Sequence, residues 1–132
     1  MGTRSRIGIQ LADDSILSIY CHYDGYPEFN GVKLQEHFNS RDAAAELIDG
    51  GDISCLWTNA GWKNEVLPET GPLYYTARGE DYPPRLDANK YDYLADGEEY
   101  AYIYTLKNEW VCYDLVHFEM PQVVAIPVTV AA

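Results

Sequence analysis

The fold of this chain is decided by residues 18–31, which read Ser-Ile-Tyr-Cys-His-Tyr-Asp-Gly-Tyr-Pro-Glu-Phe-Asn-Gly. The first part is rich in β-branched and aromatic residues that alternate between two faces, which is typical of a strand. Asp24-Gly25 then signals a tight turn, because glycine tolerates positive φ, and Tyr26-Pro27 holds the chain extended. We therefore expect a strand that ends in a turn and leads into a helix.

An earlier strand should pair with this one. Residues 5–11 alternate, with Ile7 and Ile9 on one face, and residues 12–15 have the chemistry of a turn. The sequence thus predicts an antiparallel hairpin over residues 5–23. Residues 98–116 predict a second hairpin, because two alternating runs flank Leu106-Lys107-Asn108.

Two short helices are predicted between residues 30 and 50. Asn30 is expected to cap the first, Ser40 the second, and Gly50-Gly51 to end the second. With 132 residues, the chain is long enough for one domain, residues 1–132, with its own core. We predict an α+β fold: an antiparallel sheet built mainly from the two hairpins, with two short helices packed on one face.

The last part of the chain, residues 117–132, reads as an apolar C-terminal arm. Residues 122–130 are nearly all apolar and carry no charge. Pro127 lacks a backbone donor, so the arm is expected to be an edge strand or an extended segment. It either closes the chain's own sheet or pairs with a second copy to form a homodimer, and the pattern leaves both open.

Charge and cysteine usage limit the partners and cofactors. There are 21 acidic residues against 9 basic ones, a formal charge of −12, so nucleic acid and anionic membranes should be repelled. No apolar run is long enough for a membrane span. The three cysteines have no metal-ligand spacing, and we expect reduced, buried thiols in a cytoplasm, without a metal or other cofactor.

The strongest candidate for a partner-binding surface is an acidic, tyrosine-rich stretch in the second half of the chain. Alternation puts its tyrosines on one strand face, and carboxylates beside tyrosines would steer a partner with a basic surface. The alternative is that the tyrosines pack beneath the helices, and the pattern favours neither. The candidate residues are Asp92, Asp96, Glu98, Glu99, Tyr100, Tyr102 and Tyr104.

A second set of residues could surround a small ligand. Two residues apart on a strand end, His22 and Asp24 could form a base and its orienting carboxylate, although hydrogen bonding within the turn explains them more simply. Arg78 and Arg85 could hold a phosphate or carboxylate, although internal pairing with acids is the simpler explanation. The candidate ligand residues are His22, Asp24, Tyr26, Arg78 and Arg85. No residue is assigned a catalytic role.

Three stretches carry a resemblance to a known family: residues 20–27 (Tyr-Cys-His-Tyr-Asp-Gly-Tyr-Pro), 50–54 (Gly-Gly-Asp-Ile-Ser) and 71–85 (Gly-Pro-Leu-Tyr-Tyr-Thr-Ala-Arg-Gly-Glu-Asp-Tyr-Pro-Pro-Arg). Together they resemble small, functionally uncharacterised accessory proteins of tailed bacteriophages and prophages. The resemblance spans roughly residues 5–116 and does not reach the arm. It implies a phage accessory protein that acts in the cytoplasm of the bacterial host, and it implies no catalytic residues.

These observations give two hypotheses for the function. The first is a non-enzymatic phage accessory protein that binds and inhibits a bacterial host or defence factor through an acidic, tyrosine-rich surface, for example by nucleic-acid mimicry. The second is a small-ligand binding protein or hydrolase, acting for instance on a nucleotide signal. The two differ in whether the candidate ligand residues converge on one cavity.

Overall fold

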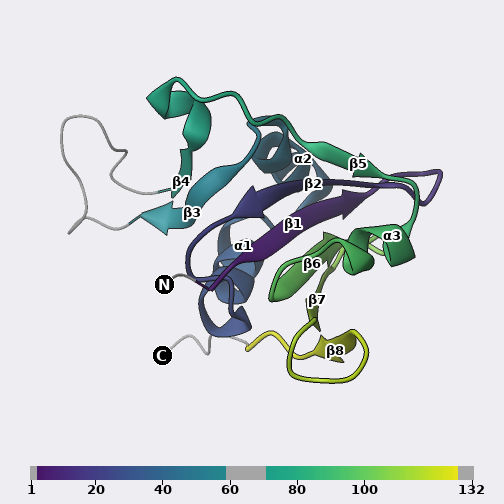
Figure 1. Cartoon of the computed structure of the whole chain (residues 1–132). Coiled ribbons are helices and arrows are strands. Elements are labelled where there is room, and N and C mark those ends of the chain that lie inside the picture. The colour runs from purple at the N-terminus through teal and green to yellow at the C-terminus, as the bar shows by residue number, and fades with distance from the viewer. Residues whose placement is uncertain (1–2, 59–70, 128–132) are drawn as a thin grey trace.

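The computed structural model describes residues 3–58 and 71–127, with the side chains of Thr58, Ala77 and Arg78 excluded. These residues form a mixed α+β fold around an eight-stranded sheet (Figure 1). Its strands are β1 (Ser5–Gln10), β2 (Ile16–Cys21), β3 (Ile53–Thr58), β4 (Gly71–Tyr74), β5 (Arg85–Asp87), β6 (Tyr100–Tyr104), β7 (Trp110–Asp114) and β8 (Gln122–Val124). The helices are α1 (Val32–His37), α2 (Arg41–Asp49) and α3 (Lys90–Ala95), with a π turn at Pro27–Gly31 and a 3-10 turn, η3, at Tyr75–Arg78.

The sheet is mixed rather than antiparallel. Its order is β4-β3-β2-β1-β6-β7-β8, and β5 pairs with β2 outside this path. The pairs β1–β2 and β6–β7 are antiparallel as the hairpin patterns predict, but β1–β6 and β2–β3 are parallel. Parallel pairs need long connections, and the segments that contain the helices provide them. Local alternation therefore identified the hairpins, but not the pairs that join them.

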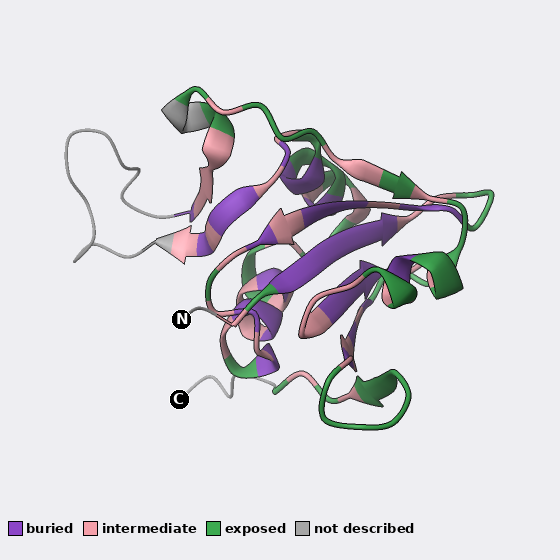
Figure 2. Ribbon diagram, viewed as in Figure 1, coloured by how far each residue is buried: buried purple, intermediate pink, exposed green. Residues whose placement is uncertain are grey.

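One face of the sheet packs against α1 and α2. Leu34, Ala44, Leu47 and Ile48 from these helices join strand residues in the larger apolar cluster. Ser40 caps α2 as predicted, since its hydroxyl accepts a hydrogen bond from the Ala43 N–H at 3.1 Å. The predicted cap at Asn30 is wrong: Asn30 lies within the π turn, and its amide donates to the Ser5 hydroxyl and the Cys21 sulfur instead. This apolar face forms the main core (Figure 2).

The opposite face packs against α3, which covers only part of it. Buried Tyr93 of α3 contacts Ile16, Ala101 and Ile103 in a smaller cluster. Its ring lies directly over Gly8 of β1, where an added Cβ would come within 3.2 Å of the ring. The same Cβ would lie only 2.7 Å from Cγ2 of Ile16, so glycine at this position lets Ile16 and Tyr93 pack closely over β1. Both faces of the central strands are thus covered.

The C-terminal arm begins by joining the sheet of its own chain. Residues Gln122–Val124 pair antiparallel with Cys112–Asp114 of β7. Val124 and Ile126 then pack against the main cluster. Residues 128–132 lie outside the described part of the chain, and pairing of the arm with a second copy stays a prediction.

The cysteines are free thiols, as expected. Cys21 and Cys112 are buried and Cys55 is half-buried. Burial raises the pKa of Cys21 and of Cys112 to about 12, so these thiols are protonated at neutral pH and are poor nucleophiles. Within the described residues, no helix has the length and apolar character needed to cross a bilayer.

Candidate functional site

The candidate site lies where the outer edge of β2 changes partners. Residues 16–18 of β2 pair with β5, whereas Cys21 pairs with Ile53 of β3. Between these partners, the Tyr20 N–H donates to the Asp52 carboxylate at 2.9 Å. A backbone donor must be satisfied in a folded protein, so Asp52 takes the place of a missing strand at this position.

A hollow of about 280 Å³ opens at this point, lined by Tyr20, Asp52, Tyr75, Glu80 and Tyr82. We call it the tyrosine hollow. Backbone hydrogen bonds brace its walls: Asp52 N–H donates to the Tyr82 carbonyl at 2.9 Å, Tyr75 N–H to the Asp52 carbonyl at 3.1 Å, and Glu80 N–H to the Tyr75 carbonyl at 3.1 Å. Asp52 therefore holds both walls of the hollow in place.

Gly51 makes this arrangement possible. Its φ is +88°, and a Cβ there would lie 2.5 Å from the Tyr82 carbonyl oxygen. Glycine adopts this backbone conformation without strain and leaves room for the neighbouring chain. Gly50 likewise lies against the Tyr74 ring, which would clash with a Cβ. The sequence pattern correctly suggested a helix stop at Gly50-Gly51, but these residues also admit the segment that forms the hollow.

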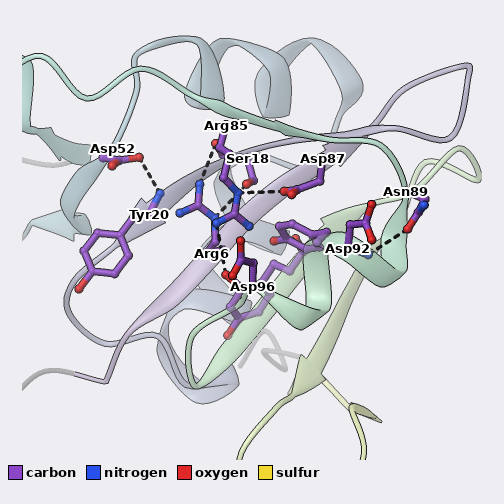
Figure 3. A network of polar contacts seen from close by, with 11 residues as sticks. Arg6, Ser18, Tyr20, Asp52, Arg85, Asp87, Asn89, Asp92 and Asp96 are labelled. Carbon is purple, nitrogen blue, oxygen red and sulfur yellow. Dashed lines mark hydrogen bonds and ion pairs between the residues drawn. The ribbon is translucent and has the colours of Figure 1, made fainter.

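Two arginines lie beside the hollow on the same face of the sheet. Arg6 of β1 is directly paired with Tyr20, so both side chains project toward the face that α3 covers. Arg6 donates to the Ser18 hydroxyl at 3.0 Å and to the Ser18 carbonyl at 3.2 Å. Arg85 donates through Nε to Asp87 at 2.9 Å and through Nη1 to the Asp96 carbonyl at 3.2 Å. Figure 3 shows the two guanidinium groups lying together between Tyr20 and Asp92.

The pair of positive charges has an electrostatic cost. Burial, followed by the charge of Arg85, lowers the pKa of Arg6. The carboxylates of Asp52 and Asp87 offset this by favouring the charged guanidinium. In addition, Arg85 Nη2 is buried and has no hydrogen-bond partner. An unpaired buried donor is uncommon in a folded protein and often marks a place where a water or ion binds.

The surroundings of Asp52 and Tyr20 in the hollow shift the pKa of both side chains. Burial raises the pKa of Asp52, while the Tyr20 N–H and the two arginines act in the opposite direction. The Tyr20 hydroxyl forms a 2.7 Å hydrogen bond with Nδ1 of His22. Burial also raises the pKa of Tyr20, so its hydroxyl is protonated at neutral pH. The hollow thus presents tyrosine rings beside acidic residues.

The predicted tyrosine stripe on β6 is not at the surface. Tyr102 and Tyr104 are 0% and 2% exposed and belong to the main cluster under the helices, while Tyr100 is half-buried at its edge. The Tyr102 hydroxyl donates to the Gly25 carbonyl at 2.7 Å, and the Arg41 guanidinium lies over the Tyr104 ring. Of the two alternatives left open by the sequence, packing beneath the helices therefore holds for Tyr102 and Tyr104, because α1 and α2 cover this face and α3 covers the Ala101 and Ile103 face. These two tyrosines are thus removed from the candidate partner-binding surface.

The acidic candidates divide into two pairs. Asp92 and Asp96 of α3 and its C-cap are exposed. Glu98 and Glu99 are half-buried and interact with Arg4: Glu98 lies 4.0 Å from its guanidinium, and Glu99 accepts from its backbone N–H at 2.7 Å. Other exposed carboxylates are distributed over the surface, for example Asp13, Glu36, Glu46 and Glu109. The acidic charge is therefore not confined to one patch.

The candidate ligand residues do not share the hydrogen bonds of a single site. His22 bonds Tyr20 rather than Asp24, and Asp24 instead accepts a 3.4 Å hydrogen bond from Tyr26. The described hydrogen bonds therefore contain no pairing of His22 with Asp24, and the simpler explanation by local hydrogen bonds fits both residues. Arg85 belongs to the cluster with Arg6, and the Arg78 side chain lies outside the described residues.

Sequence reasoning missed the five residues that line the hollow, although a signal was present. All five fall within the three stretches that carry the phage-protein resemblance, at residues 20–27, 50–54 and 71–85. These stretches are far apart in the chain and meet at the edge of β2. No periodic pattern connects them, so their convergence is a feature of the tertiary structure.

Comparisons with family models, with curated proteins and with solved structures found no match for this chain. Among the described residues, no group of three or more His, Cys, Asp or Glu side chains is arranged to hold a metal ion.

Proposed function

We propose that this protein is a non-enzymatic phage accessory protein that binds and inhibits a basic host or defence factor in the bacterial cytoplasm. The observation that carries the proposal is the outer surface of α3. There Tyr91 is 76% exposed and is followed by exposed Asp92 and Asp96. Lys90 lies over the Tyr91 ring, with its Nζ 5.6 Å from the ring centroid, and the two carboxylates follow on the C-terminal side. An exposed tyrosine beside carboxylates combines a contact residue with electrostatic attraction for a basic partner.

The same side of the sheet offers further contact area. Arg6 pairs with Tyr20, and Gly8 lies beneath Tyr93 of α3, so the tyrosine hollow and α3 share one face. Tyr82 at the hollow is 49% exposed. The proposed binding face is therefore the α3 side of the sheet, from Tyr91 to Tyr82, and it replaces the buried β6 stripe. The formal charge of −12 supports attraction of a basic partner.

The experiment is affinity capture of bacterial proteins at low and moderate salt, followed by mass spectrometry. The test variant carries Asp92→Lys and Asp96→Lys. The matched control carries Glu36→Lys and Glu46→Lys, two exposed carboxylates on α1 and α2 across the sheet. Both pairs change the net charge equally at different positions on the surface, and Glu36→Lys additionally removes the 3.7 Å ion pair with Lys33.

We expect the α3 reversal to lower recovery of one basic protein by about tenfold, and the control reversal to lower it far less. Recovery should also fall with salt, because surface charges are screened. Equal loss in both variants would show a non-specific charge effect and would contradict the proposed face.

The second candidate is binding of a small phosphate-bearing ligand, such as a nucleotide signal. The buried, unpartnered Nη2 of Arg85 beside Arg6 is the observation that favours it. An anion placed there would satisfy the donor and reduce repulsion between the guanidinium groups. A rise in melting temperature with nucleotides, lost in Arg85→Gln, would support this candidate.

A further inference from the structure

We propose that the tyrosine hollow receives an arginine side chain of the partner protein. This inference rests on the proposed function, because it names the group that a basic partner would place at this face. Its support comes from the size, the ring geometry, the charges and the rigidity of the hollow.

Size favours a single side chain over a whole small-molecule ligand. The hollow has a volume of about 280 Å³. Pockets for drug-sized ligands are about 300–1,000 Å³ and bury most of the ligand surface. The hollow is thus just below the small end of this range, and one long side chain would be enclosed in it more completely than a nucleotide.

The rings form a corner suited to a flat cation. Tyr75 and Tyr82 lie nearly perpendicular, with ring centroids 5.6 Å apart and planes at 79°. A cation within about 6 Å of a tyrosine ring is attracted by the electron-rich face. Guanidinium is planar and weakly hydrated, so it stacks on such rings better than the ammonium group of lysine.

The carboxylates that line the hollow match the donors of a guanidinium group. Asp52 already accepts one hydrogen bond from the Tyr20 N–H, and a carboxylate has about four acceptor positions, so it can accept more. Glu80 is a second acidic residue in the lining of the hollow. Arg and carboxylate groups form paired, charge-assisted hydrogen bonds that a lysine cannot reproduce.

The positive charges of Arg6 and Arg85 do not reverse this preference. Arg85 is paired with Asp87 at 2.9 Å, and Asp52 and Asp87 both stabilise the charge of Arg6. Neither arginine lines the hollow itself. Among the described residues that line the hollow, the guest would therefore meet tyrosines and acidic residues.

The hollow is also held in place before binding. Asp52 is hydrogen-bonded through its backbone to both Tyr82 and Tyr75, and the Tyr75 carbonyl in turn accepts from Glu80. Gly51 allows the closest of these approaches. A site that is already ordered loses less conformational entropy on binding, which increases affinity.

The test is an NMR titration of the full-length protein with N-acetyl-arginine amide. The neutral isostere N-acetyl-citrulline amide is the ligand control, and N-acetyl-lysine amide tests the preference for guanidinium. Tyr82→Ala is the test variant. Tyr23→Ala is its matched control, because Tyr23 is 45% exposed, close to the 49% of Tyr82, and does not line the hollow.

We expect saturable shifts of the Tyr20, Tyr75 and Tyr82 ring signals with the arginine compound and none with the citrulline compound. Tyr82→Ala should weaken the arginine affinity by about two- to thirtyfold, as expected for a lost cation–π contact, while Tyr23→Ala leaves it unchanged. Equal binding of citrulline, stronger binding of lysine, or no effect of Tyr82→Ala would overturn the inference.

Results for the two proposals can be separated. If arginine does not bind but the Asp92→Lys and Asp96→Lys variant still loses its partner, the proposed function stands and the hollow is not the receptor. If the arginine compound binds the hollow but the α3 reversal and its control capture the partner equally, the result contradicts α3 as the binding face. It still supports the hollow as an arginine-binding site.

Discussion

The two faces of the sheet differ in how they are covered. The face under α1 and α2 is continuous and apolar, with Leu34, Leu47, Ile48 and strand residues fully enclosed. The face under α3 has a small apolar cluster around Tyr93, beside a polar region that contains Arg6 and Arg85. The first face therefore provides most of the stability, and the second exposes hydrogen-bonding groups near a hollow. Four predictions test this difference.

The largest effect is expected from truncation on the apolar face. Leu47→Ala in α2 removes a side chain that is 2% exposed and leaves a cavity in the main cluster. It should lower the free energy of unfolding by about 2–5 kcal/mol. Leu94→Ala, at a half-buried position of α3, should lower the free energy of unfolding by less than half as much. Urea denaturation of both variants measures the two losses. Equal losses of unfolding free energy in the two variants would contradict the proposal that the face under α1 and α2 provides most of the stability.

Two buried tyrosine hydroxyls, each donating to a carbonyl, sharpen the comparison. Tyr102→Phe leaves the Gly25 carbonyl without its buried donor and should cost about 1–3 kcal/mol. The hydroxyl of Tyr93 donates to the Tyr102 carbonyl, which lies inside β6 between β1 and β7. That carbonyl has neighbouring strands on both sides, so Tyr93→Phe should cost only about 0.5–1.5 kcal/mol. Thermal melts of the two variants would be compared, and a larger loss for Tyr93→Phe would contradict the assignment.

A moderate effect is expected from Asp52, which replaces a strand partner on the polar side. Asp52→Ala removes the acceptor for the Tyr20 N–H and should cost about 1 kcal/mol, because the site is only half-buried. Asp52→Asn keeps an acceptor oxygen and should cost less. Hydrogen exchange of the Tyr20 amide measures this directly, and it should be faster in the alanine variant than in the asparagine variant. Unchanged exchange in both would show that Asp52 does not protect this edge.

The smallest effect concerns acid stability at the end of β7. Asp114 is buried, which raises its pKa, but hydrogen bonds from the His117 and Val116 backbones and from the His117 ring outweigh this, so its pKa is lowered overall from 3.8. A lowered folded-state pKa stabilises the protein above the unfolded value, and this contribution is lost as pH falls through the folded value. The urea midpoint of the wild type should therefore exceed that of Asp114→Asn at neutral pH, and the difference should shrink below pH 3.8. A constant difference would refute this explanation.

Local patterns predicted the local features well. The two strand pairs, β1–β2 and β6–β7, lie within the predicted hairpins, and Ser40 caps α2. The exposure of the β6 face could not be predicted, because Tyr100, Tyr102 and Tyr104 alternate in the same way on a surface or in a core. A phenol can be buried when its hydroxyl finds a partner, and for Tyr102 that partner is 77 residues away in sequence, at Gly25.

The sequence by itself determined the two hairpins, the cap of α2 at Ser40 and the acidic charge, because each depends on near neighbours or on composition. Only the tertiary structure decided which face each helix covers, that β1 pairs with β6, and that Tyr20, Asp52 and Tyr82 surround one hollow. Those features depend on contacts between segments distant in sequence. Such contacts form only where apolar burial and satisfied hydrogen bonds across the whole chain outweigh the loss of conformational entropy.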